Sequence, residues 1–248
     1  MAAFILLPAY YGIMATAAGD MALPKGTWYG NIFVMLRQLL VFTKPITNQI
    51  YDGGVNLYCG MLAVLAVFLY LFVKEHPWQK IKKYALLALL LISFNHQTLN
   101  YIWHGMHDQY GIPNRFSFVF IFVLLMMTYD AVRRITEIDI CFVISSVLLA
   151  GAFVFACKQQ AGETIGKYAL PASLVLLVLY GAACCLRSRK KITHATYIAA
   201  IGSVCLVELV ANAAYGFMDN GYCHYKKYYE TSPQVTDANV RVGELAQE

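Results

Sequence analysis

The chain has 248 residues, of which 59% are hydrophobic and 13% are charged, and its mean hydropathy is +0.54. A soluble domain carries about a quarter charged residues, so this composition excludes an ordinary soluble domain and predicts a membrane-embedded protein. The net charge of +5 does not point to a nucleic-acid partner. The lysines and arginines cluster at the ends of apolar blocks, which is typical of orientation signals in membrane proteins.

Seven apolar blocks have roughly the 20-residue length that crosses a bilayer as a helix. The first resembles a signal peptide, but no Lys or Arg precedes Lys25, so we interpret it as a membrane helix. The expected fold class is an all-α polytopic membrane protein with a membrane domain over residues 1–217. The predicted spans lie near residues 1–18, 55–73, 84–103, 116–132, 140–157, 169–186 and 193–217.

Between the first two blocks, the stretch "WYGNIFVMLRQLLVF" covers residues 28–42. Its apolar face is interrupted by Asn31, Arg37 and Gln38. It is short for a span, and the pattern predicts a helix lying at the membrane interface. The polar segment 218–248 is expected to begin an extracytoplasmic portion.

Three short basic segments occupy every second connection between the apolar blocks. They are residues 74–83, 133–134 and 187–191, and they hold ten of the nineteen lysines and arginines. By the positive-inside rule we expect all three to be cytoplasmic. The alternate connections, and with them the C-terminus, are then expected outside the cell membrane of a multi-pass protein.

The stretch "LNYIWHGMHDQYGIPNRFSFVF" (residues 99–120) is an unusually polar connection on the predicted outer side. His104, His107 and Asp108 are candidates for a metal site, because histidines at i and i+3 share a helix face. Gly105 lies between them, however, and no fourth ligand is fixed by the spacing. Histidines also suit an interface with one wet end. No cofactor is therefore firmly expected, and a divalent metal stays an open alternative.

Arg115 directly precedes a predicted span on the outer side, against the positive-inside bias. Its forked guanidinium suits a phosphate of a substrate or of a lipid headgroup. The alternative is an arginine that only extends to ordinary headgroups. Trp103 is interpreted as a belt aromatic at the interface. Polar residues 95–100 continue back into the preceding span, where they must be paired or face water.

Glu208 lies near the middle of the last predicted span, with Asn212 one turn later on the same face. An intramembrane carboxylate is a functional-site hypothesis by default, but a hydrogen bond between helices is the interpretation we favour. Asp20 and Asp52 are predicted external acids beside membrane ends and are candidates for a general base. The sequence "YDGG" around Asp52 is equally typical of a plain turn.

The segment "NYIWHGMHDQYGIPNRFSFVFIFVLLMMTYDAVR" resembles the YfhO family of bacterial multi-span membrane proteins. The segments "AAFILLPAYYG", "NLYCGMLAVLAV" and "ELVANAAYG" support the same resemblance. It implies a glycosyltransferase of the GT-C type, which moves a sugar from a polyprenyl-phosphate carrier to a cell-wall polymer such as lipoteichoic acid. The implied partners are membrane lipid, the polyprenyl-phosphate-linked sugar and the polymer acceptor, outside the bacterial cell membrane.

Family members are far longer than this chain, and GT-C enzymes usually carry their catalytic acid in the first external loop. The resemblance therefore implies a fragment that lacks this acid. Two alternatives to the transferase stay open. The first is a transporter or flippase for a lipid-linked substrate, in which Glu208 and residues 95–100 line a path, although no inverted repeat is visible. The second is a membrane module without chemistry. The predicted substrate-binding residues are Arg115, His104, Trp103, Asn100 and Arg37, with Lys44 as a further external cation.

Overall fold

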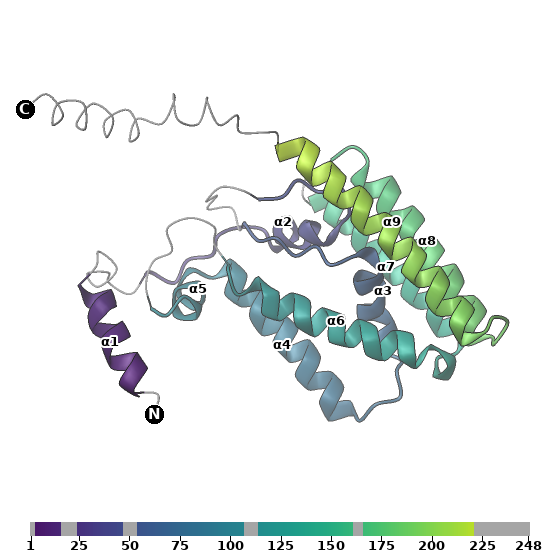
Figure 1. The fold of residues 1–248 in the computed structure, drawn as a ribbon, viewed down its shortest axis with the longest axis horizontal. Coiled ribbons are helices and arrows are strands. Elements are labelled where there is room, and N and C mark those ends of the chain that lie inside the picture. The colour runs from purple at the N-terminus through teal and green to yellow at the C-terminus, as the bar shows by residue number, and fades with distance from the viewer. Residues whose placement is uncertain (1–2, 16–23, 47–53, 107–113, 161–165, 221–248) are drawn as a thin grey trace, which may run out of the picture.

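The protein is described by a computed structural model that covers residues 3–15, 24–46, 54–106, 114–160 and 166–220. All the secondary-structure elements assigned within these ranges are helices (Figure 1), which confirms the predicted all-α class. The elements are α1 (Ala3–Met14), α2 (Ile32–Leu36), η1 (Arg37–Leu39), α3 (Met61–Tyr70), α4 (Pro77–Asn95), α5 (Gln97–Trp103), α6 (Ser117–Arg133), η2 (Ile135–Glu137), α7 (Ile140–Gln160), α8 (Ala169–Ser188) and α9 (His194–Asn220).

Three of the described helices are long and apolar enough to cross a membrane. They are α7, α8 and α9 as far as Met218. Their outward side chains are large and apolar, as at Leu148, Val178 and Val207, each more than 60% exposed. An apolar outer surface of this kind is unfavourable in water and suits lipid. The structure therefore supports a membrane protein, while the count of seven spans stays a prediction.

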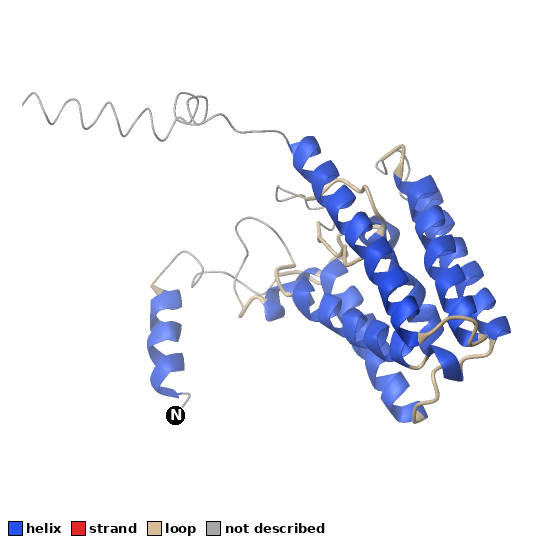
Figure 2. Cartoon of the chain, turned by 45° about the vertical axis from the view of Figure 1, so that its right-hand side comes forward, coloured by secondary structure: helices blue, strands red, loops and turns tan. Residues whose placement is uncertain are grey.

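Helix α3 forms the centre of the bundle. It is only ten residues long, and it packs against α6, α7 and α8. Leu65, Leu69 and Tyr70 on this helix are fully buried. A helix that is apolar on all sides belongs in an interior, which explains its position. Figure 2 shows α1 apart from this bundle. Its apolar side chains, such as those of Phe4 and Tyr11, are exposed.

Two of the expected helices differ from the observed ones. The block 84–103 is divided into α4 and α5 at His96, where the backbone is extended. Residue His96 pairs with Trp28 in a β-bridge, and their rings lie 5.0 Å apart. The same pairing keeps Trp28 out of a helix, so the expected interfacial helix 28–42 is reduced to α2 and η1.

The expected span 55–73 also contains a much shorter helix, because α3 begins only at Met61. The preceding residue, Gly60, has φ +99°, a backbone conformation that side chains with a Cβ rarely adopt. A helix cannot continue through this conformation. The N-terminal end of α3 lies inside the protein, next to α9, because the N–H of Met61 donates to Glu208 on that helix.

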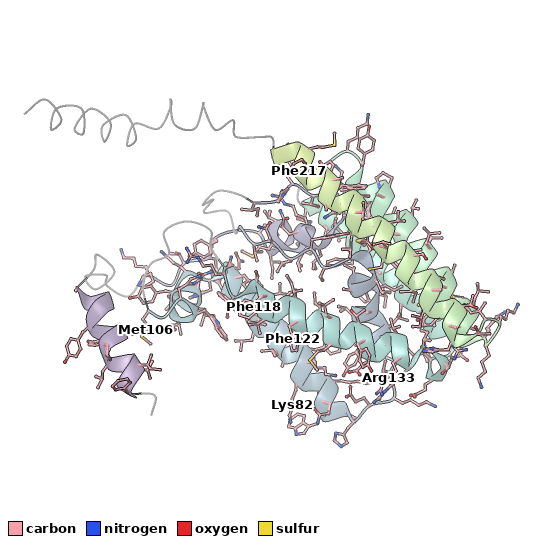
Figure 3. All side chains as sticks on the ribbon, in the orientation of Figure 1. Lys82, Met106, Phe118, Phe122, Arg133 and Phe217 are labelled. Atoms are coloured by element: carbon pink, nitrogen blue, oxygen red, sulfur yellow. The ribbon has the colours of Figure 1, made fainter. Side chains whose placement is uncertain are left out.

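The three basic connections meet at one end of the bundle. Arg134 Nη1 donates to the carbonyl oxygen of Lys74 at 3.0 Å, and Ser188 Oγ donates to that of Ile138 at 2.6 Å. Figure 3 labels Lys82 and Arg133 at this end. The three connections that are basic in the sequence thus lie at the same end of the bundle. That this end is cytoplasmic stays a prediction.

Side chains also tie this basic end together. Lys83 Nζ donates to Asp130 Oδ2 at 2.9 Å and to the hydroxyl of Tyr70 at 2.6 Å, with Glu75 Oε2 at 3.6 Å. Tyr70 in turn donates to Glu75. The cluster joins α3, α4 and α6 around a single lysine.

Candidate functional site

Two cavities of opposite character lie on the two sides of the segment formed by α2 and η1. The first, which we call the apolar cavity, has a volume of about 280 Å³ and lies between this segment, α3, α4, α6 and α7. The second, the polar cavity, has about 440 Å³ and lies between the chain around η1, the residues before α3, α6 and the end of α9. The apolar cavity is lined by residues that include Leu36, Leu39, Val64, Phe68, Leu91 and Phe120.

The polar cavity is lined by amide and hydroxyl side chains together with small apolar residues. The volume is within the range of roughly 300–1,000 Å³ found for small-molecule sites. The lining residues include Gln38, Thr43, Asn56, Tyr58, Asn212 and Gly216.

Arg37 lies in the segment that separates the two cavities. Leu36 and Leu39 on either side of it line the apolar cavity, and Gln38 lines the polar one. The Nε and Nη1 atoms of Arg37 are buried and have no hydrogen-bond partner among the described residues. Burial lowers the pKa of Arg37 from its ordinary value, yet an arginine stays protonated in proteins. The side chain as a whole is half-buried, and an anion would satisfy these two buried donors.

Glu208 is buried behind Tyr58, a residue that lines the polar cavity, and three donors converge on its carboxylate. Oε1 accepts from the hydroxyl of Tyr58 at 2.7 Å and from the backbone N–H of Met61 at 2.6 Å. Oε2 accepts from the hydroxyl of Tyr180 at 2.6 Å. The two hydroxyls and the N–H group are all assigned as donors, so both oxygens of the Glu208 side chain act as acceptors. Met61 is the first residue of α3, so the carboxylate also faces the positive end of a helix dipole.

Gly60 lies beside this carboxylate, and its φ of +99° is what calls for glycine there. A Cβ atom built on Gly60 would lie 3.8 Å from Oε2 and 3.9 Å from Oε1 of Glu208. The glycine thus supplies the backbone turn that aims the N–H of Met61 at the carboxylate.

Asn212, one turn after Glu208, connects α9 to the chain that follows η1. Its Oδ1 accepts from the backbone N–H of Phe42 at 2.7 Å, and the Phe42 ring packs against Tyr215 at 5.3 Å. Phe42 has φ +56°, which is uncommon for a residue with a Cβ. Helix α9 therefore holds two parts of the polar cavity in place. Glu208 binds Tyr58, and Asn212 binds the backbone next to Thr43.

The end of α5 places two of the predicted substrate-binding residues, Trp103 and His104, against Phe116. The Trp103 ring stacks on Phe116 at 5.1 Å, and the His104 ring contacts it at 5.7 Å. His104 Nδ1 also lies 2.8 Å from the carbonyl oxygen of Asn100. Arg115 is adjacent to Phe116 in the chain, and its side chain is exposed. Substrate binding by these residues stays a prediction.

Asn100 has a structural partner in the same region. Its side-chain amide donates to Asn114, whose own amide donates to the carbonyl oxygen of Gly54 at 3.2 Å. Asn114 is buried with φ +59°. The pair thus links the end of α5 and the start of α6 to the residues that lead into α3.

The polar residues at the end of α4 are paired with the segment before α2. The side chain of Asn95 exchanges two hydrogen bonds with the backbone of Gly30, and the Thr27 hydroxyl donates to Gln97 at 2.6 Å. The cost of placing these groups near the membrane is thereby offset within the protein.

Four of the predicted residues lie outside the described part of the chain. They are the candidate bases Asp20 and Asp52 and the candidate metal ligands His107 and Asp108. Within the described ranges, no group of three or more His, Cys, Asp or Glu side chains could hold a metal ion.

The two tyrosines that bind Glu208 were not identified from the sequence. A tyrosine within an apolar block carries a hydroxyl that needs a partner. Tyr58 and Tyr180 both fit that description, and Glu208 was the acceptor at comparable depth. The signal was therefore present, but nothing in the sequence indicated which of the chain's 18 tyrosines it concerned.

The fold and this site define a polytopic α-helical membrane protein with a buried carboxylate and two internal cavities. Comparison with family models identifies the class: residues 1–247 match the model of the bacterial membrane protein YfhO. The chain belongs to the YfhO family, as the sequence motifs predicted. No curated protein matches the chain, and no solved structure matches it.

Proposed function

We propose that this chain is part of a membrane glycosyltransferase-like protein. It transfers a sugar from a polyprenyl-phosphate carrier to a cell-wall polymer of the lipoteichoic-acid type on the outer face of the membrane. The observation that carries the proposal is the position of Arg37, a half-buried cation with two buried, unpaired nitrogens in the segment between an apolar and a polar cavity. A polyprenyl-phosphate sugar has the same three parts in the same order: an apolar chain, an anion and a polar ring.

The apolar cavity supports binding of part of the isoprenoid chain, with the remainder in lipid. Leu36 and Leu39 line it from the segment that carries Arg37. Moving an apolar chain into such a cavity is favourable. The guanidinium of Arg37 offers parallel N–H donors that match phosphate oxygens, and this match is stronger than a single ammonium contact.

In the proposed reaction, a hydroxyl of the acceptor attacks the anomeric carbon and loses its proton to a base. The bond to the carrier phosphate breaks at the same carbon, and negative charge develops on the phosphate. Arg37 stabilises that charge, with Arg115 and His104 as further external cations. Asp20 and Asp52 stay candidates for the base.

The transporter alternative has less support from the contacts. A substrate path needs polar groups that can exchange partners with the substrate. Glu208 instead accepts three hydrogen bonds from the protein, and Asn95 and Gln97 are bonded to the segment before α2. These groups fit a structural role better than a path.

The experiment uses the complete gene product in membranes, with Arg37→Ala and Arg37→Lys as variants. A phosphate bound to arginine is worth about ten- to hundredfold in affinity. We expect that loss of affinity for polyprenyl phosphate in Arg37→Ala, together with slower labelling of the polymer from the lipid-linked sugar. Arg37→Lys keeps the charge without the fork and should be intermediate.

Arg189→Ala is the matched control, because Arg189 is an exposed arginine at the basic end. It should behave as the wild type in both assays. Wild-type binding and transfer by Arg37→Ala, at equal protein levels, would reject the proposal. Movement of the substrate across sealed vesicles without polymer labelling would favour the transporter.

A further inference from the structure

We propose that the polar cavity binds a neutral, hydroxyl-rich ring, with Tyr58 as a specificity-determining contact positioned from behind by Glu208. The identity of this ring as the sugar of the lipid-linked donor rests on the proposed function. The cavity itself is argued from its own chemistry.

The side chains that line the polar cavity carry no formal charge. They comprise the amides and hydroxyls of Gln38, Thr43, Asn56, Tyr58 and Asn212, and the apolar side chains of Leu40, Pro45, Ile121 and Ala213. An anion or a cation would meet no side chain of opposite charge in such a lining. A sugar has hydroxyl groups that both donate and accept, and apolar C–H faces that pack on small residues. The lining therefore favours a neutral sugar over an ionic group.

Tyr58 is fixed as an acceptor by its bond to Glu208. Its hydroxyl hydrogen is donated to Oε1 at 2.7 Å, so the lone pairs of the same oxygen are what it can offer to a ligand. Hydrogen bonds in a chain polarise one another, and donation to a carboxylate makes that oxygen a better acceptor. A sugar hydroxyl is the matching donor.

The amides of the cavity supply complementary groups. Asn212 uses its oxygen to accept from Phe42, which leaves its NH₂ as the group able to donate to a ligand. Gln38 uses its nitrogen to donate to the carbonyl oxygen of Lys44 at 3.2 Å, which leaves its oxygen as an acceptor. The cavity thus holds a donor and two acceptors in side chains that are already oriented by the protein.

The location also matches the covalent order of the proposed donor. In a sugar phosphate ester the ring and the phosphorus are separated by one oxygen atom. Gln38, which lines the polar cavity, directly follows Arg37 in the chain. A ring in this cavity therefore has its phosphate near the residue proposed to bind it.

The test uses photoreactive alkyl glycosides that contain no phosphate, applied to the full chain in lipid nanodiscs. The panel consists of a glucoside, a galactoside and an N-acetylglucosaminide, each with a diazirine next to the sugar. Labelled positions are identified by mass spectrometry. We expect at least one glycoside to label peptides that line the polar cavity, with competition by the matching free alkyl glycoside.

Two pairs of variants locate the ring. Tyr58→Phe should lower the labelling about three- to tenfold through loss of one hydrogen bond, whereas Tyr180→Phe should change it less than twofold. Both tyrosines bind Glu208, but Tyr180 is not among the residues that line the cavity. Gly216→Leu should block labelling, since a Cβ at Gly216 lies 3.9 Å from Pro45 Cγ across the cavity wall. Gly202→Leu on the same helix meets nothing within 4 Å and is the control.

Labelling of other regions only, or by none of the three glycosides, would overturn the proposal. Equal losses in Tyr58→Phe and Tyr180→Phe would also overturn it, because they would show a structural effect transmitted through Glu208. Binding of prenyl phosphate without a sugar distinguishes this inference from the proposed function. If the glycosides label the cavity but Arg37→Ala does not weaken prenyl-phosphate binding, the proposed carrier site is rejected and the sugar site stands. If Arg37→Ala weakens prenyl-phosphate binding but the glycosides do not label the cavity, the sugar site is rejected and the carrier site stands.

Discussion

The hydroxyl of Tyr180 lies 2.6 Å from Oε2 of Glu208 and joins α8 to α9 in the interior of the bundle. Tyr58 and the N–H of Met61 complete the shell around the other oxygen. This arrangement confirms the expectation that Glu208 is hydrogen-bonded to a neighbouring helix. The carboxylate connects the residues before α3, the start of α3, and α8 to one position on α9.

Substitution of Glu208 should therefore affect stability according to how many of the three donors keep an acceptor. Glu208→Gln retains one oxygen for Tyr58 and Met61, and the Tyr180 hydroxyl can turn to accept from the new amide. We expect a loss of about 1 kcal/mol. Glu208→Ala leaves three donors without their acceptor and should cost roughly 3 kcal/mol or more. Thermal unfolding in detergent measures the difference, and equal stability of the Ala variant would contradict the structure.

Glu208→Lys provides the opposite extreme. It places a cation at the positive end of the α3 dipole. The lysine ammonium can only donate, so the three groups that donate to Glu208 would have no acceptor. We expect little folded protein, as judged by expression and size-exclusion chromatography. A stable Lys variant would mean that the carboxylate contacts are unimportant for the fold.

The contact between α7 and α8 should be intolerant of a single methyl group at Gly181. A Cβ atom there would lie 2.6 Å from Cγ2 of Val147, and a β-branched side chain cannot turn away easily. We expect Gly181→Ala to lower the free energy of unfolding by about 1–3 kcal/mol. The double variant with Val147→Ala should regain most of that stability. Gly202→Ala, which meets nothing within 4 Å, should be close to neutral.

The orientation in the membrane is tested by single cysteines in a version without the native ones. An impermeant thiol reagent added outside should label Gln109→Cys and leave Gln79→Cys unlabelled. The reason is the excess of lysine and arginine in segments that meet at one end of the bundle. Gln79 is exposed near that end, so permeabilised cells should make it reactive and provide the control. The reverse labelling pattern would invert the whole topology.

Arg115 and His104 are expected to contribute to binding of the donor phosphate. In the complete gene product, Arg115→Ala should weaken binding of the polyprenyl-phosphate sugar about ten- to hundredfold. Arg115→Lys should weaken it less, because the charge is retained while the fork is lost. Transfer rates across donor concentrations, with protein levels checked, give the result. Normal expression and wild-type rates for both Arg115→Ala and His104→Ala would show that residues 99–120 are only a connection.

The fold class and the long helices could be predicted from the sequence because they depend on local composition. The apolar lengths of α7, α8 and α9 are visible without any partner. The breaks at His96 and Gly60 could not be predicted in this way, since each is fixed by a distant residue. His96 pairs with Trp28, and Gly60 precedes Met61, whose N–H donates to Glu208. Such long-range pairings override local pattern.

The charged residues of the candidate site could be predicted from the sequence, whereas the cavities around them could not. Arg37 and Glu208 stand out because charge is rare in apolar sequence, and both were identified. The two cavities depend on how five or more segments pack, and no periodicity encodes that packing. Tyr58 links the carboxylate to the polar cavity, yet its role becomes visible only when residues 150 positions apart are brought together.

The dependence of α3 on Glu208 also has a consequence for biosynthesis. The carboxylate that accepts from the N–H of Met61 is 147 residues further along the chain. At typical synthesis rates of about 5–20 residues per second, the ribosome needs roughly 7–30 s to reach it. During that interval the start of α3 lacks its acceptor. Insertion of α9 is thus the event that completes the centre of the bundle, and chains truncated before it should be substrates for membrane quality-control proteases.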